Sequence, residues 1–313
     1  KYSIIDYPTG RSNHKIPTPR GAGLIIIPVV AISTLIFFYL IEQLFFEWII
    51  VFLLCFLLGM ISFIDDIKNF GTKVRLFLHF FIVSLSLIIY IEPITMNLFS
   101  APLLYEKYIP LIICFLFVFI LISWMWIINL YNFMDGIDGL TALQVCTVAV
   151  CTNFLSILGY INEEYQYFSL ILFSVYLAFY QFNQSPAKIF LGDVGSIPSG
   201  YLVGFIMISC LLTNGILLPI VIVNMYYILD SSITLLIRFY KRDNVLEAHS
   251  DHFYQKMIRK GYQHSYVIKW IFALNSILLI LSLLSMKLPI ISFIFSILLT
   301  TALLYLFYVK KEI

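Results

Sequence analysis

Charged residues are scarce in this sequence of 313 residues. Asp, Glu, Lys and Arg make up 12% of it, whereas 61% of the residues are hydrophobic. Soluble domains carry about 25% charged residues, so a soluble core of this size could not hide so much apolar surface. Lipid must therefore surround most of the chain, and membrane lipids are expected partners. The formal net charge of +2 says little about other partners, and no nucleic-acid partner is expected.

Cysteine is scarce as well. The five cysteines lie in apolar runs, their number is odd, and no CxxC pair occurs. This pattern is typical of small buried hydrophobic side chains, not of disulfides or a metal site. The sequence shows no cleavable signal peptide, internal repeat or low-complexity tract. Residues 1–313 are expected to form a single integral-membrane domain.

Long apolar runs dominate the sequence instead. A membrane-spanning helix needs roughly 20 apolar residues. The runs lack the alternation of a barrel, so helices must satisfy their backbone groups. The predicted fold is all-α, a polytopic transmembrane helical bundle with ten spans. These spans are residues 22–41, 46–64, 75–92, 109–128, 137–159, 165–183, 197–213, 215–237, 266–285 and 288–309.

Positive charge collects on one side of the predicted spans. Of the 19 Lys and Arg residues, only Lys107 and Lys287 fall on the other side. The positive-inside rule makes the rich side cytoplasmic. Most acids and histidines fall there too, which predicts an active site on that face. The segments that would form it are residues 1–21, 65–75, 129–138, 184–196 and 238–265.

The first two segments combine cations with paired acids. Lys15 and Arg20 lie among prolines and glycines, which suits phosphate handling but also a positively charged stop before a helix. Asp65 and Asp66 end an apolar run, where two carboxylates are costly to desolvate. As a functional pair they would shift each other's pKa or share a cation; otherwise they mark a helix exit into water. Arg75 opens the next helix and is placed to face the same site.

The segment around residues 129–138 is the least ordinary in the chain. Asn129, Asn132, Asp135 and Asp138 lie between apolar spans, with glycines that allow tight turns. On a helix, Asn132 and Asp135 would share a face, and so would Asp135 and Asp138. A purely structural role fits so many polar groups poorly.

The last two segments offer a single acid and a histidine pair. Asp193 lies between glycines at the start of a helix, where it is either an ordinary N-cap or a ligand for Mg²⁺. Mg²⁺ typically binds one or two protein carboxylates and completes its coordination shell with water and phosphate oxygens. His249 and His252 would share a helical face. Zinc is a weak interpretation because no further ligands cluster nearby. A phosphate-binding or proton-handling pair suits the surroundings better than surface histidines without a role.

Together these segments carry a family resemblance from about Arg11 to His264. The motifs PTPRGAG, FIDD, NLYNFMDGIDGL, FLGDVGS and AHSDHFYQ, in that order, resemble those of the polyprenyl-phosphate N-acetylhexosamine-1-phosphate transferase superfamily. That superfamily includes phospho-MurNAc-pentapeptide translocase and the enzymes that initiate O-antigen. The amino-acid sequences of the NFMDGIDG and HxxHFYQ motifs are more similar to those of the O-antigen-initiating branch.

The resemblance implies a reaction and a location. A UDP-N-acetylhexosamine would donate its sugar-1-phosphate to undecaprenyl phosphate, giving undecaprenyl-diphospho-sugar and UMP. The reaction would need Mg²⁺, with Mn²⁺ as a substitute, on the cytoplasmic face of the bacterial inner membrane. It would initiate a cell-envelope polysaccharide such as the O-antigen of lipopolysaccharide. A homodimer is compatible with this.

The resemblance also implies residue roles. It assigns catalysis to Asp65, Asp66 and Asp193, and a metal site to Asp193 and Asn132. The residues that it implies for substrate binding are Lys15, Arg75, Asn129, Asn132, Asp135, Asp138, His249 and His252.

Some positions depart from the family pattern. Asn69 stands where many relatives have a further acid, and Ala22 interrupts a run of three glycines. Ser250 and Asp251 stand where this branch usually has an arginine between the histidines, which bears on sugar selectivity. Relatives also have a helix before the first motif, so an eleventh span is expected ahead of Lys1.

Two other classes compete with the transferase. A secondary transporter of a lipid-linked or anionic substrate would place polar residues near the bilayer midplane in repeated halves, whereas here they lie at one membrane edge. A lipid phosphatase would hydrolyse the acceptor without any nucleotide sugar.

Overall fold

The computed structural model describes residues 5–7, 16–43, 46–68, 70–88, 109–245, 247 and 249–312. Lys15 lies outside these ranges. The described chain is all-α apart from one antiparallel pair of two-residue strands. Its elements are β1 (Ile5–Asp6), β2 (Thr18–Pro19), α1 (Gly23–Leu40), α2 (Phe46–Lys68), α3 (Thr72–Leu87), α5 (Ile109–Phe133), α6 (Leu140–Ile157), α7 (Glu164–Asn183), α8 (Asp193–Asn214), α9 (Leu218–Val223), α10 (Met225–Tyr240), α11 (Phe253–Arg259), α12 (His264–Leu284) and α13 (Pro289–Val309).

The helices form a polytopic membrane bundle. Within the described ranges, seven helices are long and apolar enough to cross a membrane: α1, α2, α5, α6, α8, α12 and α13. The predicted spans 75–92 and 165–183 correspond to α3 and α7, which do not belong to that set. The predicted all-α membrane fold is therefore confirmed, whereas the number of ten spans is not.

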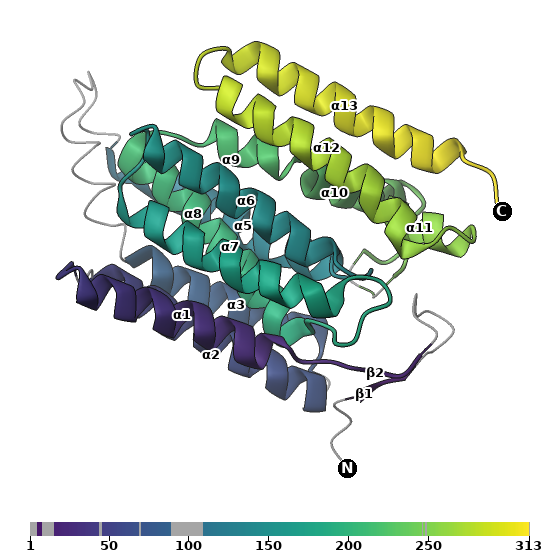
Figure 1. Cartoon of the computed structure of the whole chain (residues 1–313), viewed down its shortest axis with the longest axis horizontal. Helices are drawn as coiled ribbons and strands as arrows, with labels where there is room; N and C mark the ends of the chain where they lie inside the picture. The colour runs from purple at the N-terminus through teal and green to yellow at the C-terminus, as the bar shows by residue number, and fades with distance from the viewer. Residues whose placement is uncertain are drawn as a thin grey trace.

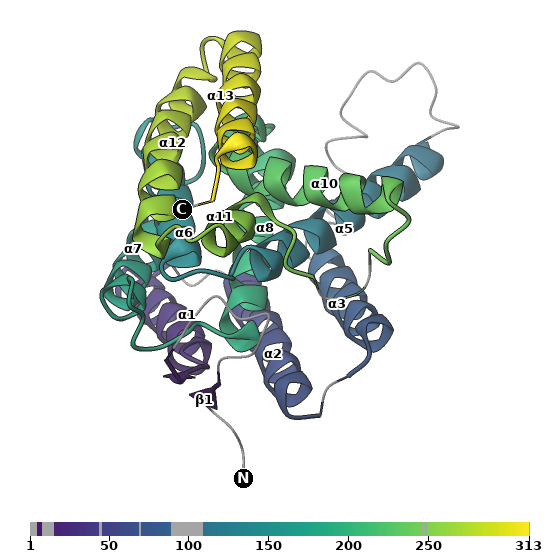
Figure 2. The ribbon, with the colours of Figure 1, turned by 90° about the vertical axis from the view of Figure 1, so that its right-hand side faces the viewer.

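The predicted span 215–237 is wrong as a single helix, because the chain breaks at Asn224 between α9 and α10. The Asn224 side chain is buried, and its Oδ1 accepts hydrogen bonds from Tyr131 Oη (2.8 Å) and Gln144 Nε2 (3.1 Å). Asn275 Nδ2 in turn donates to Gln144 Oε1 at 2.9 Å. These bonds from three other helices satisfy polar groups at the break. Beyond it, α10 passes beside α5 (Figure 2).

Helix α8 is the central element of the bundle. It is almost entirely buried and packs against α2, α5 and α1. Its small residues allow close helix approach, as is common in membrane bundles. A Cβ placed on Gly204 would lie 2.2 Å from the Trp124 ring, and one placed on Gly23 of α1 would lie 2.3 Å from the Gly195 backbone. Backbone packing therefore fixes where α8 begins relative to α1.

The polar connections gather at one end of the bundle. Figure 1 shows β1, β2 and α11 at the same end. Arg75 at the start of α3 pairs with Asp65 at the end of α2 and with Asp193 at the start of α8. Arg20, before α1, pairs with Asp66. These ion pairs bring parts of three of the expected segments together, and an active site on one face stays a prediction.

Candidate active site

Arg75 joins two acids that come from different helices. Its Nη1 lies 3.5 Å from Asp65 Oδ2 in the last turn of α2 and 3.6 Å from Asp193 Oδ2 at the first residue of α8. Asp65 is buried and also accepts a 2.7 Å hydrogen bond from the Phe70 N–H. The bond and the cation offset the cost of burying its charge.

Asp193 opens α8, as its sequence position predicted. Gly192 before it has φ +73°, a left-handed conformation that suits glycine. The N-terminal end of a helix stabilises a negative charge. Asn132 lies close by and donates from Nδ2 to Ser196 Oγ at 3.2 Å. Its Oδ1 is therefore the side-chain atom that would bind a cation.

Arg20 is held beside α8 by backbone hydrogen bonds. The Gly21 and Ala22 N–H groups both donate to Phe190 O at 3.1 Å, and the Phe190 N–H donates to Pro19 O at 2.8 Å. From this position Arg20 Nη2 lies 3.7 Å from Asp66 Oδ1. The segment before α1 thus supplies a second cation next to the acid pair.

Asp135 and Asp138 lie in the connection between α5, which ends at Phe133, and α6, which begins at Leu140. The expectation that these acids share a helical face with Asn132 or with each other is therefore wrong. Burial raises the pKa of Asp135 to about 8, and the negative charge of Asp193 adds to this shift. A cation bound between these acids would hold Asp135 ionised.

Asp138 is fixed in a different way. His264 Nδ1 lies 3.2 Å from its Oδ2, and the Ala187 N–H donates to the same oxygen at 3.2 Å. Burial alone would raise the pKa of Asp138, but the His264 contact and the Ala187 hydrogen bond outweigh it and lower the pKa below its usual value. Asp138 therefore stays ionised at neutral pH.

The predicted helical face of His249 and His252 is wrong, because α11 begins only at Phe253. His252 precedes α11, and its N–H donates to Gln255 Oε1 at 3.2 Å. The two rings nevertheless lie together, stacked with centroids 5.1 Å apart. Burial, His252 and Arg238 lower the pKa of His249 to about 4, so it is neutral at physiological pH.

Asp251 stands where the family pattern led us to expect an arginine, and two arginines approach it. Arg238 Nη1 lies 2.5 Å from Asp251 Oδ2, and Arg259 Nη2 lies 3.6 Å from its Oδ1. These arginines come from α10 and α11. Positive charge is therefore present next to the histidines although the loop itself carries an acid.

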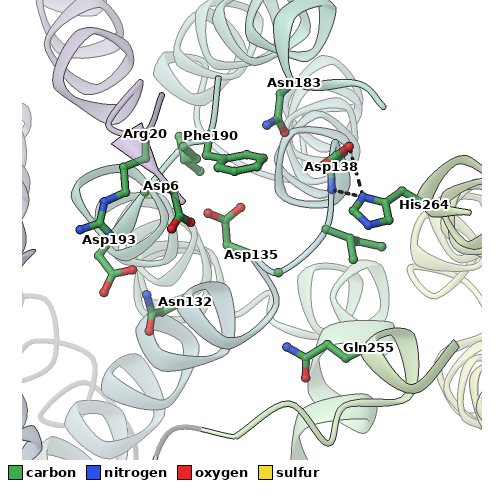
Figure 3. A pocket seen from close by; sticks show the side chains of 14 residues that line it. Asp6, Arg20, Asn132, Asp135, Asp138, Asn183, Phe190, Asp193, Gln255 and His264 are labelled. Carbon is green, nitrogen blue, oxygen red and sulfur yellow. Dashed lines mark hydrogen bonds and ion pairs between the residues drawn. The ribbon is translucent and has the colours of Figure 1, made fainter. Parts of the chain in front are cut away.

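Two cavities meet at the centre of these residues. Cavity 1, of about 260 Å³, and cavity 2, of about 600 Å³, share Asn132, Asp135 and Asp193 in their linings. In Figure 3, Arg20 and Asp193 lie on one side of cavity 1, Asp138 and His264 lie on the other, and Asp135 lies between them. A ligand group at this junction can be reached from both cavities.

The predicted site residues divide into three groups. Eight of them line a cavity: Asp138 lines cavity 1, and cavity 2 is lined by Arg75, Asn129, Asn132, Asp135, Asp193, His249 and His252. The second group is Asp65 and Asp66, which line neither cavity; Asp65 pairs with Arg75, and Asp66 pairs with Arg20. The third group is Lys15, which lies outside the described residues. The chemical roles of these eleven residues stay predictions.

Sequence reasoning missed several residues at the site. Asp6 on β1, Asn183, Phe190 and Gln255 line cavity 1 although none of them was predicted as a site residue. Phe190 and Gln255 do lie in the motifs FLGDVGS and AHSDHFYQ. Asp230 on α10 is fully buried and touches His252. A lone acid within an apolar run is a recognisable signal, because such residues in membrane helices are usually functional.

The donor set at the junction fits Mg²⁺ better than a metal held by several protein ligands. Among the residues the structure describes, no three His, Cys, Asp or Glu side chains cluster as metal ligands. Asp193 offers one carboxylate and Asn132 one amide oxygen, next to open cavity space. Mg²⁺ uses such sparse protein sites when phosphate and water complete its shell.

A comparison with known families identifies the chain. Residues 48–211 match the family described as Glycosyl transferase family 4. The chain belongs to this family. It is a sugar-phosphate transferase, and the superfamily that the motifs predicted is confirmed.

Individual relatives come from two branches. The chain is 24% identical over 299 residues to the probable undecaprenyl-phosphate N-acetylglucosaminyl 1-phosphate transferase of Bacillus subtilis, covering 89% of this chain and 78% of that protein. It is 24% identical over 312 residues to the phospho-N-acetylmuramoyl-pentapeptide-transferase of Dinoroseobacter shibae, covering 90% and 83%. With the Lactococcus lactis protein of that name it shares 34% identity over 116 residues, 36% of this chain and 33% of that protein.

Proposed function

We propose that this transferase moves an N-acetylated sugar-1-phosphate from a UDP-sugar to undecaprenyl phosphate and releases UMP. The observation that carries the proposal is the junction at Asn132, Asp135 and Asp193, where a polar cavity meets a larger one with an apolar wall. Two substrates that enter from different sides would bring their phosphates together there. The reaction would take place at the cytoplasmic face of the inner membrane, on the side rich in Lys and Arg.

Cavity 1 suits the nucleotide part of the donor. The Phe190 ring offers a face on which a base can stack, and the ionised Asp138 carboxylate can accept hydrogen bonds from base or ribose groups. Arg20 at the opposite side is placed to meet the diphosphate, for which a guanidinium is a good partner. A UDP-sugar bound in this way would have its base near Phe190 and Asp138 and its diphosphate near Arg20 and Asp193.

Cavity 2 suits the lipid acceptor. Its lining includes Leu76, Trp126 and Leu235 on one hand and Arg75 and His249 on the other. An amphipathic molecule with one anionic end matches this division between apolar and polar lining. The acceptor phosphate would lie near Arg75, at the edge of the bundle that carries the polar loops.

The chain's own residues would position the two anions. An acceptor phosphate oxygen would bond to the β-phosphorus of the donor while the bond to the UMP oxygen breaks. Arg20 and Arg75 would reduce the repulsion between the reactants, and Asp66 and Asp65 would hold these arginines in place. Mg²⁺, held by Asp193 and Asn132, would neutralise the diphosphate and stabilise the leaving group.

The polymer branch is a finer part of the proposal. We infer an N-acetylhexosamine donor from the similarity to the Bacillus subtilis protein over 89% of this chain. The proposed role in initiating O-antigen rests only on the amino-acid sequences of the NFMDGIDG and HxxHFYQ motifs. The relatives named for transfer of phospho-N-acetylmuramoyl-pentapeptide make the peptidoglycan precursor the second donor to test.

The decisive experiment is a transfer assay with purified protein. Undecaprenyl phosphate, Mg²⁺ and a panel of UDP-sugars would be supplied, and UMP release and lipid product would be measured. We expect UMP with one N-acetylated donor and none when the lipid is omitted. No UMP with any donor would reject the proposal. Transport into vesicles without UMP would favour a transporter, and phosphate release without a donor would favour a phosphatase.

A further inference from the structure

Asp230 is a buried acid on α10 that the proposed transfer does not yet use. Its exposed fraction is 0%, and its carboxylate accepts a hydrogen bond from Tyr226 Oη at 3.1 Å. Asp230 Oδ1 also lies 3.1 Å from His252 Nδ1 and accepts the Phe253 N–H at 3.1 Å. A buried carboxylate is costly unless donors satisfy it. Here two of its partners belong to the start of α11.

His252 is the link between Asp230 and cavity 2. Its ring is 2% exposed and lies between the rings of His249, at 5.1 Å, and Tyr254, at 5.8 Å. His252 lines cavity 2 together with His249. Because Nδ1 lies against Asp230, Nε2 is the ring nitrogen left for a ligand. A carboxylate at Nδ1 favours the proton on that nitrogen.

Asp230 also fixes the backbone of this segment. Its bond to the Phe253 N–H satisfies a donor in the first turn of α11, where no helical acceptor exists. The same carboxylate thus sets the position of α11 and the orientation of the His252 ring. In Asp230→Asn the amide oxygen can still accept the Phe253 N–H, so loss of the charge would mainly release the His252 ring, at the wall of cavity 2 that holds the two histidines.

We propose that Asp230 is a positioning residue of the transfer reaction, holding His252 through Nδ1 so that Nε2 meets a phosphate oxygen in cavity 2. The inference rests on the proposed function, because it needs an anionic substrate in that cavity. Asp230 does not touch the substrate; it acts through His252. This separates it from the acids at the junction, which line the cavities themselves.

A double-mutant cycle tests this coupling. Asp230→Asn keeps the shape of the side chain and removes its charge, and we expect kcat/KM for UMP release to fall about 10- to 100-fold, as for other residues that orient a ligand-binding histidine. In a His252→Gln background the same change should cost less than about 2-fold, because the residue through which Asp230 acts is already gone. Costs that multiply independently would overturn the proposal.

Two further measurements keep the test independent of folding and of the overall function. Nitrogen NMR of labelled histidine in the wild-type protein should show Nδ1 of His252 protonated, the signal being assigned by its loss in His252→Gln. An unprotonated Nδ1 would overturn the proposal even if Asp230→Asn does not fold. Asp243→Asn, at an exposed position after α10, is the matched control and should keep wild-type turnover. A wild-type protein that releases no UMP would reject the proposed function, whereas the NMR result would still report on the Asp230–His252 contact.

Discussion

Arg75 Nη1 lies 3.6 Å from Asp193 Oδ2, which links the start of α3 to the start of α8. The same nitrogen lies 3.5 Å from Asp65 Oδ2. One guanidinium therefore sits between two carboxylates from helices that are far apart in the sequence. Substrate phosphates that enter cavity 2 would compete with these acids for Arg75, and Asp65 would keep the side chain in place.

Two replacements of Arg75 should distinguish the contribution of its charge to activity from the contribution of its planar guanidinium. Arg75→Lys keeps the charge but replaces the planar guanidinium, whose Nη1 lies near both acids, with a single ammonium that leaves no second nitrogen for a phosphate. We expect kcat/KM for UMP release to fall about 10-fold in Arg75→Lys and about 100-fold in Arg75→Gln, in line with loss of one charge-assisted contact to a reacting phosphate. Arg242→Lys, at an exposed position, should keep wild-type values. Wild-type activity in Arg75→Lys would mean that the planar guanidinium is dispensable and a single positive charge is sufficient.

Replacement of Asp193 should affect metal dependence. Asp193→Asn removes one of the two carboxylates, with that of Asp135, that line both cavities at the junction. We expect a fall in kcat on the order of 100-fold or more, together with a higher Mg²⁺ concentration for half-maximal activity. Thermal unfolding would show whether the variant is folded, and Asp243→Asn serves as the charge-matched control. Unchanged turnover and an unchanged Mg²⁺ requirement would remove Asp193 as the ligand.

Asp135 should make the substrate-free protein less stable as the pH rises. Its pKa in the folded protein is about 8, above the usual 3.8, so between about pH 4 and about pH 8 the folded state binds more protons than the unfolded state. The free energy of unfolding therefore declines over this window because of Asp135. Thermal unfolding without metal or substrate should show a flatter pH dependence in Asp135→Asn. Parallel curves for variant and wild type would contradict this assignment.

Gly23 should tolerate no larger side chain. A Cβ there would lie 2.3 Å from the Gly195 backbone, so Gly23→Val must push α1 away from α8. We expect a loss of about 1–3 kcal/mol in the free energy of unfolding, the usual cost of overpacking. UMP release should fall as well, because the segment that carries Arg20 would move. Gly71→Ala is the control, since nothing lies within 4 Å of a Cβ at that position; equal stability of both variants would refute the packing argument.

Sequence reasoning found those site residues whose positions depend on local boundaries. Asp65 at the end of α2 and Asp193 at the start of α8 lie where apolar runs meet polar loops, and such boundaries are visible in the sequence. The motifs then supplied the family. The ion pairs of Arg75 were not predictable in detail, because they depend on how α3 packs against α2 and α5.

Features that depend on distant partners escaped prediction. The break at Asn224 is satisfied by Tyr131 and Gln144, which come from other helices, so the apolar run around it resembles one continuous span. The position of His252 just before α11 depends on the contacts of His252 and Phe253 with Asp230 on α10. Hydrophobic periodicity records which residues avoid water, and it carries no information about which remote polar groups will meet.

The junction at Asn132, Asp135 and Asp193, which both cavities share, also bears on inhibitor design. A compound with a nucleoside at one end and a short alkyl chain at the other could occupy cavity 1 and cavity 2 at once. Its linker would have to be neutral or cationic where it passes Asp135 and Asp193. Such a bisubstrate mimic would gain from two modest binding surfaces joined in one molecule. Either half alone should bind far more weakly.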